Sequence, residues 1–370
     1  MLTDDQLNHI RKFASPSRES GYTRSIYSYP AKFLSHLPQE LIKIFTQEGD
    51  RICDPFVGGG TTGLEAMLLN RQFIGYDINP FAILVSRVKT TYISKEELHE
   101  GLKVIHRNIE SLKEQSNDYL DSTDKECLGK LISSELNFLA SSIKKASLNA
   151  TLRDFFSLAL IHVTKLIGRR DFEERENWQH LSMIPMFTRK CNKMIDAVSS
   201  LPHSVQFPPT FHLGSNHDMD VPEHSIDFIL TSPPYLEVDV EYQQIQIQRR
   251  SLGKSKRTDF ISKLLGTQPL PKKDLCWTGQ GGSFYWSNLE RSLSGSYRIL
   301  KPNRCLCIWT GFKTKENQRK LITTIKKVHF NLLEVISIPL SDNRTASSRS
   351  THHKRNTRML KEDSIYILTK

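Results

Sequence analysis

The chain has no long apolar run, and its few cysteines show no metal-binding pattern. Its most apolar stretch, residues 155–163, falls well short of the roughly 18 residues that a bilayer-spanning helix needs. None of the six cysteines forms a Cys-x-x-Cys pair, which argues against a zinc site and a disulfide framework. The first residues are acidic and polar rather than apolar, so we expect no signal peptide and no membrane partner. These absences together predict a cytoplasmic protein without a metal.

Acidic residues are also fewer than basic ones. Lys and Arg number 51 against 40 Asp and Glu, a formal net charge of +11. This surplus favours a polyanionic partner but specifies no fold. With 370 residues, of which 38% are hydrophobic and 25% charged, the composition excludes wholesale disorder. The length predicts one large domain with an insertion, or two domains.

A strand, a glycine turn, a helix and a second strand follow one another early in the chain. Apolar residues 51–57 lead into three consecutive glycines, residues 61–69 have helical spacing, and the next strand ends at Asp77. This order is typical of a βαβ unit in a parallel sheet. The loop continues into Thr-Thr-Gly with no lysine, which disfavours the two common nucleotide motifs. Asp77 can accept both hydroxyls of a ribose, or instead cap the next helix.

A second motif, Ser232-Pro233-Pro234-Tyr235, directly follows the apolar strand at 225–231. Two prolines remove two backbone donors and stiffen the chain, so this segment cannot continue a central strand. It can hold a hydroxyl, a carbonyl and an aromatic face at the carboxyl edge of the sheet. Ligands bind at that edge in open α/β folds.

These two motifs together resemble those of the S-adenosylmethionine-dependent DNA amino-methyltransferases. Thr-Ser-Pro-Pro-Tyr at 231–235 is most similar to the N4-cytosine type of bacterial restriction–modification systems. Tyr-Pro-Ala-Lys-Phe at 29–33 resembles the family's N-terminal cofactor-contacting motif, and residues 284–302 resemble the helix, turn and strand after its active site. The resemblance covers about residues 25–90 and 205–312 and the final two strands.

The resemblance implies an α/β, Rossmann-like class I methyltransferase fold. Its sheet would be seven-stranded and mostly parallel with an antiparallel last strand, and unpermuted because the glycine loop precedes Ser-Pro-Pro-Tyr. We expect an N-terminal segment and the first half of the catalytic domain at 1–90, a helical insertion at 91–205 and the second half at 206–370. Basic, DNA-contacting loops are expected at 237–282 and 341–361. The insertion can be a DNA-recognition subdomain, a dimer surface or a scaffold.

The resemblance also implies roles for individual residues. Phe56, Gly58 and Gly60 would bound the methionine part of S-adenosylmethionine, and Asp77 would hold its ribose. Asn216 stands near the position where the family often has an acid that contacts the adenine. The full set of expected cofactor residues is Tyr29, Lys32, Phe33, Asp54, Phe56, Gly58, Gly60, Thr61, Thr62, Asp77, Ile78 and Asn216.

In this reading the catalytic residues are Ser232, Pro233, Pro234 and Tyr235. They would receive a flipped cytosine from double-stranded DNA, with Tyr235 stacking on the base. A cytosine C5 mechanism is disfavoured because the chain has no Pro-Cys dipeptide. A paired restriction endonuclease would act on the same DNA sequence. Phosphate contacts are expected from Arg249, Arg250, Lys254, Lys256, Arg257, Arg344, Arg349, Lys354, Arg355 and Arg358.

Three alternatives remain open at this point. The chain can be an N6-adenine DNA methylase, although adenine enzymes of the family mostly carry Asp or Asn at the position of Ser232. It can be an RNA amino-methylase, for which no RNA-binding module is recognisable. It can also be a non-enzymatic DNA-binding subunit, which would tolerate a broken glycine loop or active-site motif, whereas both are intact.

Overall fold

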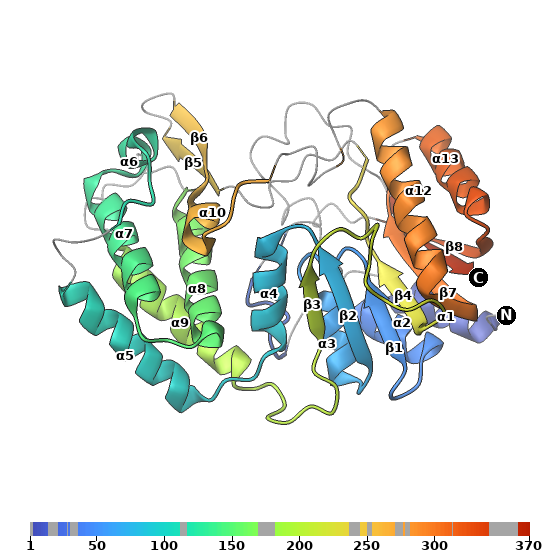
Figure 1. The fold of residues 1–370 in the computed structure, drawn as a ribbon, viewed down its shortest axis with the longest axis horizontal. Helices are drawn as coiled ribbons and strands as arrows, with labels where there is room; N and C mark the ends of the chain where they lie inside the picture. The colour runs from blue at the N-terminus through green and yellow to red at the C-terminus, as the bar shows by residue number, and fades with distance from the viewer. Residues whose placement is uncertain are drawn as a thin grey trace.

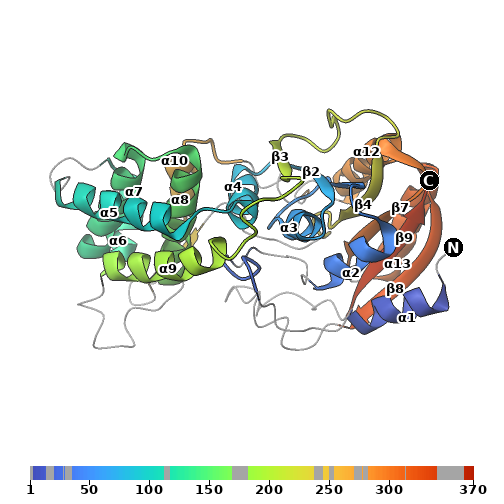
Figure 2. The same cartoon turned by 90° about the horizontal axis from the view of Figure 1, so that it is seen from below.

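The computed structural model describes residues 3–13, 21–27, 29, 36–111, 117–168, 182–236, 245–249, 254–270, 277, 282–312, 314–339 and 362–370. These residues form a sheet-containing half and a helical half, which lie side by side (Figures 1 and 2). The described helices are α1 (Asp4–Phe13), α2 (His36–Phe45), α3 (Thr61–Leu68), α4 (Pro80–Thr90), α5 (Lys95–Ser111), α6 (Ser122–Leu128), α7 (Lys130–Lys145), α8 (Ala150–Gly168), α9 (Met183–Val198), α10 (Phe260–Leu265), α12 (Gly282–Ile299) and α13 (Lys315–Lys327). The described strands are β1 (Arg51–Asp54), β2 (Gln72–Asp77), β3 (Thr210–Leu213), β4 (Ile226–Thr231), β5 (Ile245–Arg249), β6 (Lys254–Thr258), β7 (Leu300–Thr310), β8 (Asn331–Pro339) and β9 (Glu362–Thr369).

The main sheet has the strand order β3-β2-β1-β4-β7-β9-β8. Its first five strands pair in parallel, and β9 is antiparallel to both of its neighbours. The predicted Rossmann-like sheet, with seven strands in unpermuted order and an antiparallel last strand, is therefore confirmed. The carboxyl ends of β1, β2 and β4 meet at one edge, where the glycine turn, Asp77 and Ser-Pro-Pro-Tyr follow them.

Helices cover both faces of the sheet because its central strands are apolar on both sides. All six residues of β4 are buried. Ile229 packs in the core under α12 and α13, whereas Phe228 and Leu230 pack in the core under α1, α2 and α3. A continuous apolar run of this kind is typical of a strand covered on both faces.

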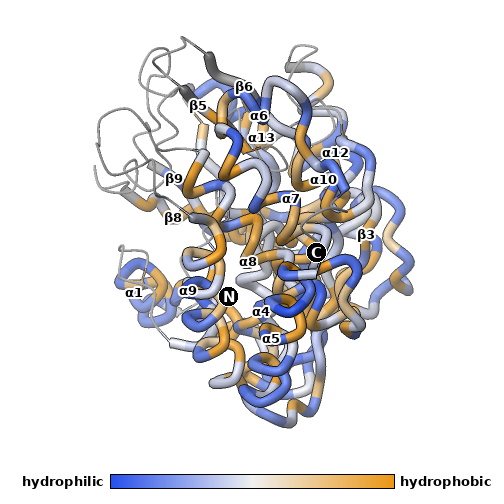
Figure 3. The backbone as a smooth tube through the Cα atoms, turned by 90° about the vertical axis from the view of Figure 1, so that its left-hand side faces the viewer, coloured by the Kyte–Doolittle hydropathy of each residue, from blue (hydrophilic) through white to orange (hydrophobic). Residues whose placement is uncertain are grey.

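The helical half has a core of its own, formed by α5 to α9. Phe155 and Phe156 of α8 are fully buried, together with Leu139 of α7 and Phe187 of α9. Helix α8 is apolar on nearly every side because the other helices surround it. Figure 3 shows how hydrophobic and hydrophilic positions alternate along the outer helix α5. Helix α4 joins the halves, since it follows β2 and buries side chains such as Val85 in the helical core.

The region at 237–282 differs from the expected loop, because its described residues include a hairpin and a short helix. Strands β5 and β6 form an antiparallel pair, and α10 follows them. Ile245 and Ile247 point to one face and are buried in the helical core with Phe260. These few apolar residues are outnumbered by polar and basic ones, so the composition of the segment predicts a loop. The hairpin therefore packs on the helical half, although it lies in the second part of the chain.

Strand β7 begins at Leu300, within the segment 284–302 that resembles a helix, turn and strand. Residues 301–303 lie within the strand as a bulge. Pairing with β4 jumps from Ile226–Leu300 to Phe228–Cys305, and Asn303 has a φ of +61°. Proline does not end this strand because the bulge takes it out of the hydrogen-bonding ladder.

A short N-terminal segment, residues 21–27, is fastened to both α3 and α4. Arg24 donates from Nε and Nη2 to the two carboxylate oxygens of Glu65, at 2.8 and 2.7 Å. The Glu65 side chain has no exposed area, and that of Arg24 is 15% exposed. The Thr23 hydroxyl donates to the carbonyl oxygen of Lys89 at 2.5 Å. This segment ends just before Tyr29.

Breaking the Arg24–Glu65 pair should destabilise the fold. Arg24→Ala leaves a buried carboxylate without its bidentate partner, so we expect a loss of about 3–5 kcal/mol in the free energy of unfolding. Urea denaturation measures this loss. Arg107→Ala is the control, because its partner Glu100 is exposed and solvent-exposed ion pairs contribute little to stability. Equal effects of the two variants would contradict the prediction.

Candidate active site

A buried carboxylate ties the glycine loop to the strand that carries the second motif. Asp54, at the end of β1, is 1% exposed. Its Oδ1 accepts hydrogen bonds from the Thr231 hydroxyl at 2.7 Å and the Phe56 amide at 3.0 Å, and its Oδ2 accepts from the Thr62 hydroxyl at 2.8 Å. Burial raises the pKa of Asp54 to about 6, against the opposing effect of these donors. Asp54 therefore fixes the ends of β1 and β4 relative to the first turn of α3.

Helix α4 packs against the glycine loop and donates a hydrogen bond to it. Lys89, 1% exposed, donates from Nζ to the carbonyl oxygen of Gly59 at 2.9 Å. Gly60 has a φ of +72°, and a Cβ there would lie 2.8 Å from the Cα of Ser86. The backbone of α4 thus approaches the loop more closely than any side chain at position 60 allows. This contact explains the third glycine without any ligand.

Asp77 makes the turn contact that its sequence position allowed, and it also borders a cavity. Its Oδ1 accepts a hydrogen bond from the Asn79 amide at 2.8 Å, which is a turn contact at the start of α4. Its Oδ2 accepts from the Gly58 amide at 2.9 Å, and the residue also lines a cavity. Burial raises the pKa of Asp77 to about 6. The side chain therefore shapes the glycine loop and also borders the space in front of it.

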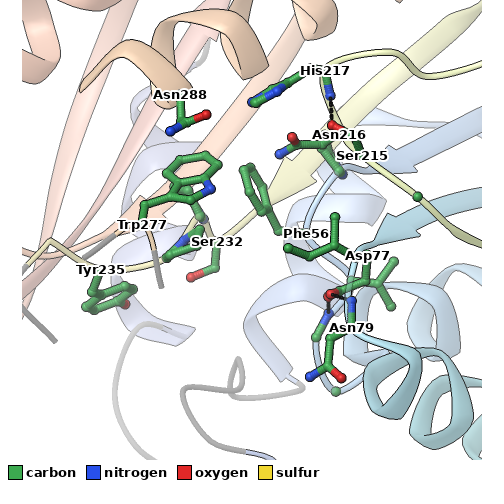
Figure 4. A pocket seen from close by; sticks show the side chains of 18 of the residues that line it. Phe56, Asp77, Asn79, Ser215, Asn216, His217, Ser232, Tyr235, Trp277 and Asn288 are labelled. Carbon is green, nitrogen blue, oxygen red and sulfur yellow. Dashed lines mark hydrogen bonds between the residues drawn. The ribbon is translucent and has the colours of Figure 1, made fainter. Parts of the chain in front are cut away.

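That space is a cavity of about 400 Å³ at the carboxyl edge of the sheet. Figure 4 shows Asp77, Asn216 and Ser232 around it, with the Phe56 ring between them. Tyr29 lines it too, and its hydroxyl accepts a hydrogen bond from Asn79 Nδ2 at 3.0 Å. The expected residues that line the cavity are Tyr29, Phe56, Gly58, Thr61, Asp77, Ile78, Asn216, Ser232, Pro233, Pro234 and Tyr235.

Other expected residues do not line the cavity. Asp54, Gly60 and Thr62 lie behind the loop and support it. Lys32 and Phe33 lie outside the described residues, as do Arg250, Arg344, Arg349, Lys354, Arg355 and Arg358. For Arg249, Lys254 and Lys256 the structure describes only the backbone, in the β5–β6 hairpin, and Arg257 is exposed on β6. Their contacts with DNA stay a prediction.

The structure adds cavity residues that the sequence reading did not assign. Trp277 is 6% exposed and meets the Phe56 ring edge-on, with centroids 5.2 Å apart. The His217 ring stacks on Trp277 at 6.3 Å, and burial and nearby Arg291 lower its pKa. Phe284, Asn288 and Arg291 of α12 also border the cavity. The resemblance at 284–302 indicated only a helix, turn and strand, and this does not show which face of the helix meets a ligand.

Asn216 has a defined place at the α12 side of the cavity. It is 7% exposed, and its Nδ2 donates to the Ser292 hydroxyl at 3.2 Å. Asn288 lies across from it in Figure 4.

Within the described ranges no group of three His, Cys, Asp or Glu side chains is arranged to hold a metal ion. Among the same residues no helix combines the length and apolar character needed to cross a bilayer.

The matched segment of the chain includes the glycine loop and Asp77. A DNA methylase family model matches residues 6–87. Over this segment the chain is similar to DNA methylases. The expected cofactor, S-adenosylmethionine, agrees with this match. The family covers both N6 and N4 methylation, so the match does not distinguish the two.

Curated relatives of the chain include Type II methyltransferases. The chain is 38% identical over 90 residues to Type II methyltransferase M.BglI of Bacillus subtilis, covering 24% of this chain and 26% of that protein. It is 30% identical over 118 residues to Type II methyltransferase M.MjaII of Methanocaldococcus jannaschii, covering 32% and 22%. The matched part therefore spans about a quarter of these relatives' length. An S-adenosylmethionine-dependent methyltransferase structure from Methanosarcina mazei aligns with 89% of this chain and 96% of that one, at 10% identity and a TM-score of 0.37.

The packing of Gly60 against α4 predicts a large cost for a single methyl group. Gly60→Ala should lower the free energy of unfolding by more than the roughly 1–2 kcal/mol that a left-handed backbone costs an alanine, because Ser86 must also move. Gly266→Ala is the matched control: its φ of +70° and ψ of +31° are close to the +72° and +20° of Gly60, and nothing lies within 4 Å of the added Cβ. Urea unfolding compares the two, and similar losses would exclude the close contact.

Proposed function

We propose that this protein transfers a methyl group from S-adenosylmethionine to the exocyclic N4 amine of a cytosine flipped out of double-stranded DNA. In this proposal it is the modification enzyme of a Type II restriction–modification system, with a cognate endonuclease acting on the same DNA site. One observation carries the proposal: Ser232 to Tyr235 border the same cavity as Gly58 and Asp77. The similarity to Type II methyltransferases supports it.

The cavity fits the proposed cofactor. Its volume of about 400 Å³ lies in the usual range for small-molecule sites. Gly58 has a φ of +50°, which favours glycine, and a Cβ there would lie in contact with the Tyr29 ring, 3.4 Å away. In this proposal Asp77 accepts hydrogen bonds from the ribose hydroxyls, Asn216 contacts the adenine, and Tyr29 and Phe56 cover the ligand. S-adenosylmethionine, when bound, supplies an electrophilic methyl group.

The other end of the cavity suits a planar base that carries an amine. The Ser232 hydroxyl and the Pro233 carbonyl oxygen accept hydrogen bonds from the amine in this proposal. These contacts turn the amine lone pair toward the cofactor and favour its nucleophilic form. The Tyr235 ring stacks on the base, and the two prolines keep Ser232 and Tyr235 in fixed positions. Alignment and fixed dipoles, rather than a strong base, then provide most of the rate acceleration.

The choice of cytosine over adenine depends on Ser232. Both bases present an exocyclic amine beside a ring nitrogen acceptor, so the amine contacts alone discriminate poorly. Serine has a shorter side chain than the Asp or Asn of most adenine enzymes in the family that the motifs resemble. The shorter hydroxyl suits the smaller pyrimidine ring. N6-adenine methylation is the alternative that the matched family equally covers.

Four of the residues proposed to contact DNA, Arg249, Lys254, Lys256 and Arg257, belong to the β5–β6 hairpin. The β5–β6 hairpin lies on the helical half, on the side toward which β2 and β3 point (Figure 1). Arg257 of this hairpin is exposed. A duplex that reaches the cavity would have the hairpin beside it, and the net charge of +11 favours such a partner. This placement supports phosphate contacts from the basic residues of the hairpin.

Cofactor binding should weaken in acid, because the ribose hydroxyls need an ionised Asp77. With its pKa near 6, Asp77 is protonated below that pH. We expect the Kd for S-adenosylmethionine to rise by up to about tenfold per pH unit below 6. Asp77→Asn should bind weakly at every pH, and any slope that it retains belongs to Asp54. Calorimetry from pH 5 to 8 measures this, with Asp220→Asn, an exposed acid outside the cavity, as control. A flat wild-type profile would rule out the ribose role.

The product should be N4-methylcytosine. Nucleoside mass spectrometry of DNA from cells that express the protein identifies the methylated base. Ser232→Ala should lower turnover by about 10²-fold, the scale of one well-placed polar contact in a transition state. Ser200→Ala, an exposed residue after α9, should leave turnover unchanged. If N6-methyladenine dominates, the adenine alternative is correct. If 5-methylcytosine appears instead, the amine mechanism is wrong.

A further inference from the structure

Beside the proposed base-binding end of the cavity, the second described residue of β9 forms a small buried network. Asp363 is 8% exposed. Strand β9 runs antiparallel to β7, with Ser364 paired to Thr310, so its first residues lie at the carboxyl edge of the sheet. The Ser-Pro-Pro-Tyr segment leaves β4 at this same edge. Two segments separated by more than a hundred residues of sequence are therefore neighbours here.

A single carboxylate oxygen of Asp363 accepts two hydrogen bonds. Trp309 Nε1 donates to Oδ2 at 3.0 Å, and the Tyr235 hydroxyl donates to the same oxygen at 3.2 Å. Trp309 is 4% exposed on β7, and its indole N–H can only donate. The tryptophan therefore fixes the orientation of the carboxylate, and the carboxylate in turn presents a fixed acceptor to Tyr235.

Tyr235 needs such an anchor more than the other residues of its motif. The two prolines restrict the backbone before it, but they do not restrict rotation of the tyrosine side chain. Residues 232–235 belong to no helix or strand. A hydrogen bond from the far end of the ring to a charged acceptor restricts both side-chain torsions at once. The ring is then held in one plane before any base arrives.

We propose that Asp363 is a positioning residue that holds the Tyr235 ring in its base-stacking orientation, with Trp309 orienting Asp363. The inference rests on the proposed function, since it assigns Tyr235 to the flipped base. Holding the ring in advance lowers the entropic cost of stacking. Asp363 has no contact with the base or the cofactor in this scheme. It acts through Tyr235 alone.

A double-mutant cycle tests whether the two residues act together. Asp363→Ala and Tyr235→Phe should each lower kcat/KM for DNA by about tenfold, the scale of a hydrogen bond to a charged group. The double variant should lose no more than either single variant. Asp363→Asn, which retains an acceptor, should recover part of the activity, and the Kd for the cofactor should stay unchanged. Losses that multiply in the double variant would overturn the proposal.

A spectroscopic readout separates this inference from the proposed function. In protein labelled with 3-fluorotyrosine, the fluorine resonance that disappears in Tyr235→Phe identifies Tyr235 among the 11 tyrosines. Asp363→Ala should shift and broaden this resonance, whereas Ser364→Ala, the next residue of β9, should not. An unchanged resonance would overturn the positioning role, whether or not the protein methylates DNA. If Asp363→Ala does not fold, the same comparison is made with Asp363→Asn, and Tyr235→Phe supplies the kinetic loss. If the resonance responds but no DNA is methylated, the proposed function fails alone.

Discussion

The cavity depends on the hydrogen bonds of one buried carboxylate. Asp54 joins three parts of the chain: its own loop through Phe56, helix α3 through Thr62, and strand β4 through Thr231. Thr231 directly precedes Ser232, so the same carboxylate fixes the loop at one end of the cavity and the Ser-Pro-Pro-Tyr segment at the other. Burial makes this arrangement costly, as the raised pKa of Asp54 shows. The hydrogen bonds from Phe56, Thr62 and Thr231 offset the cost of burying the carboxylate. They also fix the loop, α3 and β4 relative to one another.

The helical half is connected to this site through the N-terminal segment and α4. Lys190 of α9 donates from Nζ to the carbonyl oxygen of Ile26 at 2.6 Å, and Lys165 of α8 donates to the Tyr27 hydroxyl at 3.2 Å. Tyr29, two residues further along the chain, lines the cavity. Lys89 of α4, in turn, holds the glycine loop. Contacts from the helical half and α4 therefore reach the cavity directly at Gly59 and lie close in sequence to Tyr29. These hydrogen bonds connect the two halves of the molecule in addition to the continuous chain.

The sequence alone predicted the sheet and most of the cavity, but not the cavity's far wall. The βαβ pattern around residues 51–77 and the strand before Ser232 are local signals, because glycine, proline and apolar alternation act over a few residues. Trp277 and Asp363 were missed, since their roles depend on contacts across the sheet edge with Phe56 and Tyr235. The hairpin at β5–β6 was also missed, because two isoleucines are a weak pattern when basic residues surround them. Burial in the helical core, which stabilises it, is a tertiary effect.

The pairing at the ends of β8 and β9 has a consequence for how such a protein can diversify. Pro339 lies opposite Glu362, so the segment between them enters and leaves the sheet at one point. Lengthening a loop whose ends are already joined costs little, about 0.6 kcal/mol for each doubling. A change of chain length between Pro339 and Glu362 therefore costs little and is compatible with the same β8–β9 pairing, which also places Asp363. This junction is thus a natural position for grafting segments of different length from related proteins.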